Sequence, residues 1–161
     1  MPCYDNAIEV TKMNYRHRFQ IKAPLSSVAA FHQKHTSMGE ITPPPIRVEF
    51  HRLPADFSDG GELEFTLWFG PIPIRWTASI EGASASGFTD RLVTGPFSQW
   101  VHRHIFVQVD DQTTEVIDQI GLRLKPHLLW GPVGLAFALG LPVLFAYRGW
   151  KTRRLLEKGS L

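Results

Sequence analysis

The sequence predicts a single α+β domain, in which an antiparallel sheet of about seven strands is followed by a long C-terminal helix. Short stretches of alternating apolar and polar residues follow one another from Tyr15 to Leu124, turns rich in glycine and proline separate them, and an apolar segment closes the chain. Of the 161 residues, 43% are hydrophobic, 12% aromatic and 20% charged. This composition fits one globular domain over residues 1–161 and excludes a disordered or disulfide-stapled chain.

The N-terminal segment precedes the predicted fold, and we expect residues 1–13 to form a mobile tail. Residues 1–10 lack the apolar run of a signal peptide. Cys3 is the only cysteine, which excludes an internal disulfide and a cysteine-based zinc site and favours a reducing, cytoplasmic compartment. The net charge of +2 gives no indication of a nucleic-acid partner, and we expect none.

The first strand is predicted from Tyr15 to Ile21, where apolar and polar residues alternate. A short helix is expected over Leu25–His35, with Pro24 as its first residue. Residues 42–45 predict an extended turn, because their three consecutive prolines exclude both a helix interior and a central strand.

Six further strands are predicted from the same alternation, and they cover residues 46–50, 63–69, 74–80, 88–92, 98–109 and 113–124. The connections between them are short and rich in glycine, as in residues 58–61 and 82–84. Short connections favour an antiparallel meander, since parallel strands need long crossovers.

The last segment leaves two interpretations open. Leu128 to Tyr147 is twenty residues long without a charge, and a basic flank follows it, comprising Arg148, Lys151, Arg153, Arg154 and Lys158. At ~1.5 Å per residue this segment would just cross ~30 Å of hydrocarbon, but a soluble helix lying on the sheet is the favoured alternative. Residues 140–142 (Gly-Leu-Pro) predict a break, after which a new helix runs to about Lys158.

The order of elements is that of the helix-grip fold, and particular motifs resemble the START/Bet v 1-like (SRPBCC) superfamily. Within it the chain resembles small bacterial proteins of the polyketide cyclase/dehydrase and lipid-transport type. The motifs are Ala23-Pro24, Thr42-Pro43-Pro44, Phe88-Thr89-Asp90, Gly95-Pro96-Phe97, Trp100-Val101-His102-Arg103-His104-Ile105-Phe106, Thr114 to Asp118 and Leu144-Phe145-Ala146-Tyr147-Arg148. The Gly-Pro-Phe and Trp-x-His-x-His-x-Phe block is the most specific of them.

The resemblance implies a curved sheet that grips the long helix, with an apolar cavity between them for a lipid, sterol, polyketide or similar molecule. Catalysis occurs only in some branches of the superfamily, so the fold alone does not make this protein an enzyme. No metal and no cofactor is expected.

Polar residues are predicted on the inner face of the sheet. Trp100, His102, His104 and Phe106 share one face of their strand, and Asp118 shares the more apolar face of the next one.

A turn over residues 110–112 places His104 opposite Asp118, and a hairpin through Gly95-Pro96 brings Asp90 near Trp100 or His102. His17 approaches Asp118 if the first strand pairs with the last. The sequence therefore predicts a polar track of His17, Asp118, His104, His102 and Asp90 inside an aromatic interior.

Four interpretations of this track remain open. Its members satisfy one another as buried groups, or they orient a polar group of an apolar ligand. Alternatively, His104 and Asp118 act as a catalytic general-base pair, since imidazole titrates near neutrality and a carboxylate can fix its tautomer. A metal held by His102, His104 and a carboxylate is the weakest interpretation.

The predicted function is binding of an apolar small molecule without catalysis, in a cavity walled by Phe65, Leu67, Trp76, Trp100 and Phe106 with His102, His104 and Asp118 at its polar end. The alternative is an aromatase/cyclase or dehydratase-like enzyme that uses the His/Asp pair. Motifs of hydrolases, kinases and dehydrogenases are absent from the sequence.

The C-terminal helix is apolar around its circumference over Val133–Tyr147. A sheet covers only one side of such a helix. We therefore expect its other side to contact either an anionic membrane surface or a second copy of the chain.

Overall fold

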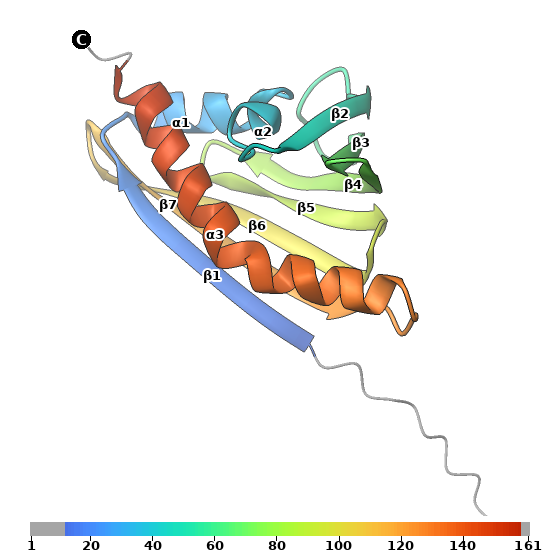
Figure 1. Cartoon of the computed structure of the whole chain (residues 1–161). Helices are drawn as coiled ribbons and strands as arrows, with labels where there is room; N and C mark the ends of the chain where they lie inside the picture. The colour runs from blue at the N-terminus through green and yellow to red at the C-terminus, as the bar shows by residue number, and fades with distance from the viewer. Residues whose placement is uncertain (1–11, 159–161) are drawn as a thin grey trace, which may run out of the picture.

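The computed structural model describes residues 12–158. Its elements are, in chain order, β1 (Lys12–Ile21), α1 (Leu25–His32), α2 (Ser37–Glu40), β2 (Ile46–Arg52), β3 (Glu62–Phe69), β4 (Ile72–Ser84), β5 (Gly87–Thr94), β6 (Phe97–Asp110), β7 (Thr113–Leu124) and α3 (Trp130–Leu156). Figure 1 shows the long helix α3 lying across one face of a curved sheet. The helix-grip α+β architecture predicted from the sequence is confirmed.

The seven strands form one antiparallel sheet in the order β1-β7-β6-β5-β4-β3-β2. The strands from β2 to β7 follow one another as a meander, as their short connections predicted. The first strand instead pairs with the last, so the chain crosses from one edge of the sheet to the other through α1 and α2. This crossing places both short helices beside the C-terminal half of α3 (Figure 1).

Small residues let α3 approach the sheet closely. A Cβ added at Gly134 would lie 3.2 Å from the side chains of Leu124 and Phe97, and one added at Gly149 would lie 3.2 Å from the ring of Phe19. Between these two points α3 contributes its large buried side chains to the main core, namely Leu141 and Phe145 with the smaller Ala138. Removing these apolar surfaces from water is the main force that holds the helix on the sheet.

The predicted break at residues 140–142 is wrong, because α3 is one continuous helix from Trp130 to Leu156. Pro142 lies inside it, and Figure 1 shows that the helix bends midway. Proline has no N–H to donate to the preceding turn, which accounts for a bend. Leu141 and Phe145, each 2% exposed, anchor the helix to the core on both sides of Pro142.

The structure does not favour α3 as a membrane span, because this helix packs in the core of the domain. By length and composition α3 is the one helix in the described part of the chain that could cross a membrane. It is instead the core helix of this fold, since its inner face completes the hydrophobic core of the sheet.

Several boundaries differ from the sequence prediction. The helix α1 ends at His32 rather than His35, because the N–H of Lys34 bonds to the carbonyl of Phe31 and so tightens the last turn. Pro24 is the residue before this helix rather than its first residue, and α2 was not predicted. β1 already begins at Lys12, whereas residues 1–11 of the predicted tail, including Cys3, lie outside the described residues.

Candidate functional site

The strand register brings the predicted polar residues together. His104 pairs with Asp118 across β6 and β7, as the turn position predicted, and Asp90 on β5 pairs with His102. His17 on β1 pairs with Asp118 from the other side. Because cross-strand partners on one face lie within contact distance, this register collects two imidazoles and two carboxylates at one place on the inner face of the sheet.

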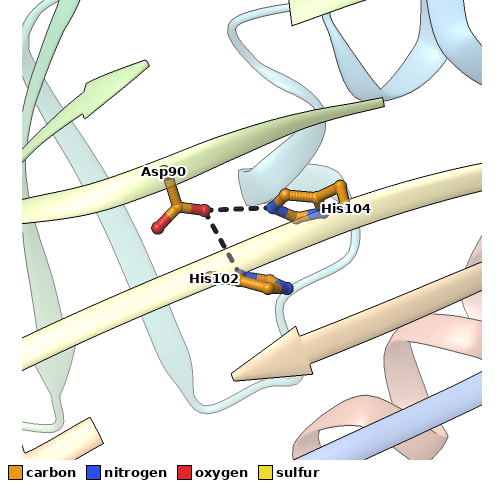
Figure 2. Close-up of side chains that lie close together, drawn as sticks. All are labelled: Asp90, His102 and His104. Carbon is orange, nitrogen blue, oxygen red and sulfur yellow. Dashed lines mark hydrogen bonds and ion pairs between the residues drawn. The ribbon is translucent and has the colours of Figure 1, made fainter. Parts of the chain in front are cut away.

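Four of these side chains, Asp90, His102, His104 and Asp118, form what we call the His–Asp cluster. His102 Nε2 donates to Asp118 Oδ1 at 2.9 Å, and His104 Nε2 donates to Asp90 Oδ2 at 3.0 Å. His102 Nδ1 lies 3.3 Å from the same oxygen of Asp90, so one carboxylate oxygen joins both rings (Figure 2). The hydrogen bonds therefore run diagonally: His102, which is paired with Asp90 in the strand register, bonds to Asp118, and His104, which is paired with Asp118, bonds to Asp90.

The imidazole rings of His102 and His104 are tilted by 37° to one another, with centroids 3.7 Å apart. His104 Nδ1 is 3.3 Å from Asp118 Oδ1, but the alignment does not make a hydrogen bond, and this nitrogen is buried without a hydrogen-bond partner. His104 also stacks on Phe88 at a centroid distance of 4.2 Å. The cluster is therefore closely packed, and one of its nitrogens has no hydrogen bond.

The His–Asp cluster contains charged side chains that are shielded from solvent. Burial by itself lowers the pKa of His102, but the attraction of Asp90 and the hydrogen bond to Asp118 outweigh it and raise this pKa to about 9. Burial would raise the pKa of both carboxyls, but the two histidines outweigh that effect and hold each pKa below its ordinary range. At neutral pH His102 is an imidazolium between two carboxylates.

A cavity lies between the cluster, α3 and the two short helices. Its volume is about 120 Å³. Its apolar walls include Met38, Phe57, Phe65, Leu67, Trp76, Phe88, Trp100, Phe137, Leu144 and Phe145, and its polar lining includes Asp90, His102, His104, His32, His35 and Arg148. An apolar cavity with polar groups gathered at one side is the usual form of a small-molecule site.

Most of the predicted cavity residues line this cavity, namely Phe65, Leu67, Trp76, Trp100, His102, His104 and Asp90. Asp118 does not line it but hydrogen-bonds His102 from within the core. Phe106 packs in a second core cluster, with its ring 4.9 Å from that of His32. His17 packs on Phe19 and Phe145, and among residues 12–158 it makes no hydrogen bond or ion pair, so it does not join the cluster.

Several polar residues of the cavity were missed by sequence reasoning, namely His32, Lys34, His35, Ser37 and Arg148. His32 on α1 donates from Nδ1 to the carbonyl of Val28 at 2.9 Å, and burial lowers its pKa to about 4, so its ring is neutral. Arg148 was assigned to the exposed basic flank of the last helix, but it lines the cavity. The signal was available: Arg148 follows Leu141 and Phe145 at helical spacing and therefore shares their inward face.

The cluster offers a set of metal-ligand atoms, because those of Asp90, His102 and His104 lie within 4.8 Å of one another. A histidine binds a metal through an unprotonated nitrogen. Both nitrogens of His102 face carboxylates, and the raised pKa keeps this ring protonated. A metal bound here would therefore have to displace a proton from His102 and separate one of its nitrogens from a carboxylate.

Comparison with known proteins gives matches of fold. No protein-family model matches the chain, and no curated protein matches it. A norcoclaurine synthase from Thalictrum flavum, solved with a transition-state analogue, matches with a TM-score of 0.68 at 10% identity over 94% of this chain and 98% of that one.

Two bacterial structures match similarly. A START superfamily protein from Mycobacterium smegmatis has a TM-score of 0.68 at 11% identity, covering 90% of this chain and 97% of that one. The Zhui aromatase/cyclase from Streptomyces sp. R1128 has a TM-score of 0.66 at 15% identity, covering 90% and 96%. At these identities the three matches establish a common fold.

Proposed function

We propose that this chain, whose fold is that of START/Bet v 1-like proteins, binds an apolar small molecule in the cavity between α3 and the sheet, without catalysis. The observation that carries this proposal is the cavity itself, which is walled by aromatic side chains and has the His–Asp cluster at one side. Its volume of about 120 Å³ compares with the ~150 Å³ apolar cavity that holds a benzene molecule in a protein core. A ring-sized group fits the side chains as they stand, whereas a sterol or a full lipid requires them to move.

In this proposal the aromatic walls supply the affinity for the ligand, and the His–Asp cluster sets the ligand's orientation. Trp76 and Trp100 lie 5.2 Å apart edge to face, and both line the cavity, so a ring entering it replaces water contacts with aromatic ones. His104 is one of the polar residues that line the cavity, and a ligand with one hydrogen-bonding group would place that group next to it.

Tryptophan fluorescence tests this proposal, because Trp76 and Trp100 line the cavity. The triple variant Trp68→Phe, Trp130→Phe and Trp150→Phe removes the three tryptophans outside the cavity lining and is titrated with single-ring aromatics, polyketide-like phenols, fatty acids and sterols. We expect saturable quenching by at least one class and its loss when Ala78→Leu fills part of the cavity. If none of the four classes gives a saturable change, the proposal is wrong.

An aromatase/cyclase-like enzyme is the second candidate, and His104 favours it because its ring lines the cavity instead of being sealed away from it. In this scheme His104 takes a proton from the substrate and Asp118, which contacts both imidazoles, positions them. The test is cyclisation of a poly-β-ketone thioester mimic, followed by the absorbance of the aromatic product. A His104→Gln variant as active as the wild type would remove this candidate.

We also propose a cytoplasmic protein that docks on an anionic membrane surface through the outer face of α3. The face carries Leu135, Leu139, Val143 and Trp150, which are 42%, 70%, 74% and 46% exposed. Arg154 stacks over Trp150 at 5.1 Å, so positive charge adjoins the apolar face, where anionic headgroups favour it.

Liposome sedimentation separates membrane docking from a homodimer that buries the same face. Binding to anionic but not neutral vesicles, lost in Lys151→Glu with Arg154→Glu, is the expected result. Arg153 is left unchanged because its Nε donates to the carbonyl of Gln20 and so ties α3 to β1. Concentration-dependent self-association without vesicle binding would instead support the dimer.

A further inference from the structure

One basic side chain from α3 reaches the cavity. Arg148 lines it together with Phe145, and the guanidinium carbon lies 5.3 Å from the centre of the Phe145 ring. Arg148 follows Phe145 by three positions and precedes Thr152 by four, and both of these neighbours are buried against the sheet. The helix therefore directs the Arg148 side chain toward the cavity, whereas Arg153 and Arg154 do not line it.

Arg148 has no ion-pair partner among residues 12–158, and its Nε is buried without a hydrogen-bond partner. In the described part of the chain three buried side-chain polar atoms lack a partner, and the other two are His35 Nδ1 and His104 Nδ1. All three residues line the same cavity. Buried polar groups in native proteins are almost always hydrogen-bonded, and of these three atoms Arg148 Nε can only donate, so it calls for an acceptor inside the cavity.

The nearby carboxylates do not supply that acceptor. Asp90 and Asp118 lie close enough to raise the pKa of Arg148, although burial outweighs them and leaves it below its ordinary value. Their short contacts, of 2.9 to 3.3 Å, are all with His102 and His104. The positive charge of His102 offsets one of the two negative charges of the cluster, and the guanidinium of Arg148 lies over the Phe145 ring without an ion pair to either carboxylate.

We propose that the molecule bound in the cavity carries a carboxylate, which Arg148 binds, next to an apolar ring or short chain that the aromatic walls enclose. The inference rests on the proposed function of the cavity and adds the chemical class of its ligand. A guanidinium pairs with a carboxylate through two parallel N–H···O bonds, and its Nε can only donate. A monocarboxylate with an apolar body fits better than a phosphate, because the cavity wall is mostly aromatic and two carboxylates lie nearby.

The test compares three ligands of nearly equal shape, namely phenylacetate, phenylacetamide and 2-phenylethanol. Calorimetric titration is carried out on the wild-type chain, on Arg148→Met, which keeps an apolar side chain of similar length, and on Arg148→Lys, which keeps the charge. Far-UV circular dichroism and thermal unfolding establish that each variant is folded. Arg154→Met serves as the matched control, because that arginine stacks on Trp150 outside the cavity lining.

We expect the wild type to prefer phenylacetate over phenylacetamide by on the order of tenfold or more, the usual effect of a hydrogen bond to a charged group. Arg148→Met abolishes this preference and still binds the neutral ligands, Arg148→Lys retains part of it, and Arg154→Met leaves it unchanged. Equal wild-type affinity for phenylacetate and phenylacetamide, or a preference that survives in Arg148→Met, overturns the inference while leaving the cavity's proposed function intact. If phenylacetate, the two neutral ligands and all four ligand classes of the fluorescence titration fail to bind the wild type, both proposals are wrong.

Discussion

Three members of the His–Asp cluster, Asp90, His102 and His104, line the same cavity as Arg148, but the cluster and this arginine hold charge away from water in opposite ways. In the cluster, the imidazolium of His102 lies between Asp90 and Asp118 at 3.3 and 2.9 Å, so its charge is neutralised by the protein itself. Arg148 has no carboxylate at such a distance in the described residues, and its pKa is lowered by burial.

This difference distinguishes structural charge from functional charge. A buried charge whose partners are all internal contributes to the fold, and removing one partner leaves the other uncompensated. A buried cation without an internal partner costs free energy in the empty protein, and that cost is recovered only when an anion arrives from outside. Stability and ligand binding should therefore respond oppositely to substitutions in the two regions.

The largest effect is expected from Asp118→Asn, which keeps the shape of the side chain and removes its charge. His102 then loses one of its two carboxylates, and we expect the free energy of unfolding at pH 6.5 to fall by about 3 kcal/mol. Urea denaturation measures it. Glu81→Gln, which breaks a surface pair with Arg91, is the control and should have a much smaller effect. A loss for Asp118→Asn no greater than that of the control would show that the cluster does not support the fold.

The pH dependence of unfolding gives the next effect. The pKa of His102 rises from 6.5 to about 9 on folding, so its contribution is complete below pH 6.5 and is lost as the pH rises through 9. This loss amounts to roughly 3 kcal/mol. His32 behaves inversely, because its pKa falls from 6.5 to about 4 and its contribution is lost as the pH falls through that range.

Stability should therefore be greatest near pH 6.5. Urea denaturation at pH 5, 6.5 and 9 checks this, with His102→Gln as the variant that should flatten the alkaline side and His32→Gln as the one that should flatten the acidic side. Unchanged stability of the wild type between pH 6.5 and 9 would contradict a charged His102 in the folded state.

The smallest effect on stability is expected from Arg148→Met. The substitution removes a partly buried cation without an ion-pair partner and keeps most of the side-chain volume, so the free energy of unfolding should change by less than about 1 kcal/mol, or increase. Thermal unfolding of the ligand-free protein measures it. A loss as large as that of Asp118→Asn would mean that Arg148 is a structural partner of the cluster, and the distinction between the two regions would disappear.

The sequence was sufficient for the strands and for the positions of the polar residues along them. Alternation and short turns fixed which residues face inward, and the turn near residues 110–112 fixed the pairing of His104 with Asp118. These features depend on residues close together in the chain, where strand periodicity and turn geometry leave few choices. The motifs that resemble START/Bet v 1-like proteins added the position of the long helix across the sheet.

Only the tertiary structure decided which side chains complete the site. The diagonal bonds of the His–Asp cluster, the separation of His17 from it and the inclusion of His32 depend on side-chain orientation and on how α1 packs, and strand register does not specify these. The continuity of α3 through Pro142 was likewise decided by tertiary packing, because anchoring on both sides of the proline compensates for its missing hydrogen bond.

Arg148 shows the limit most clearly. In the chain it stands shortly before Lys151, Arg153 and Arg154, and its positive charge by itself groups it with these basic residues. The helix geometry places it instead one turn beyond Phe145 on the inner face, where the sheet, α1 and α2 enclose it in the cavity. The sequence by itself determined that an arginine stands at this position, whereas its partial burial without an ion-pair partner is a property of the assembled fold, because charge compensation depends on contacts between residues that are distant along the chain.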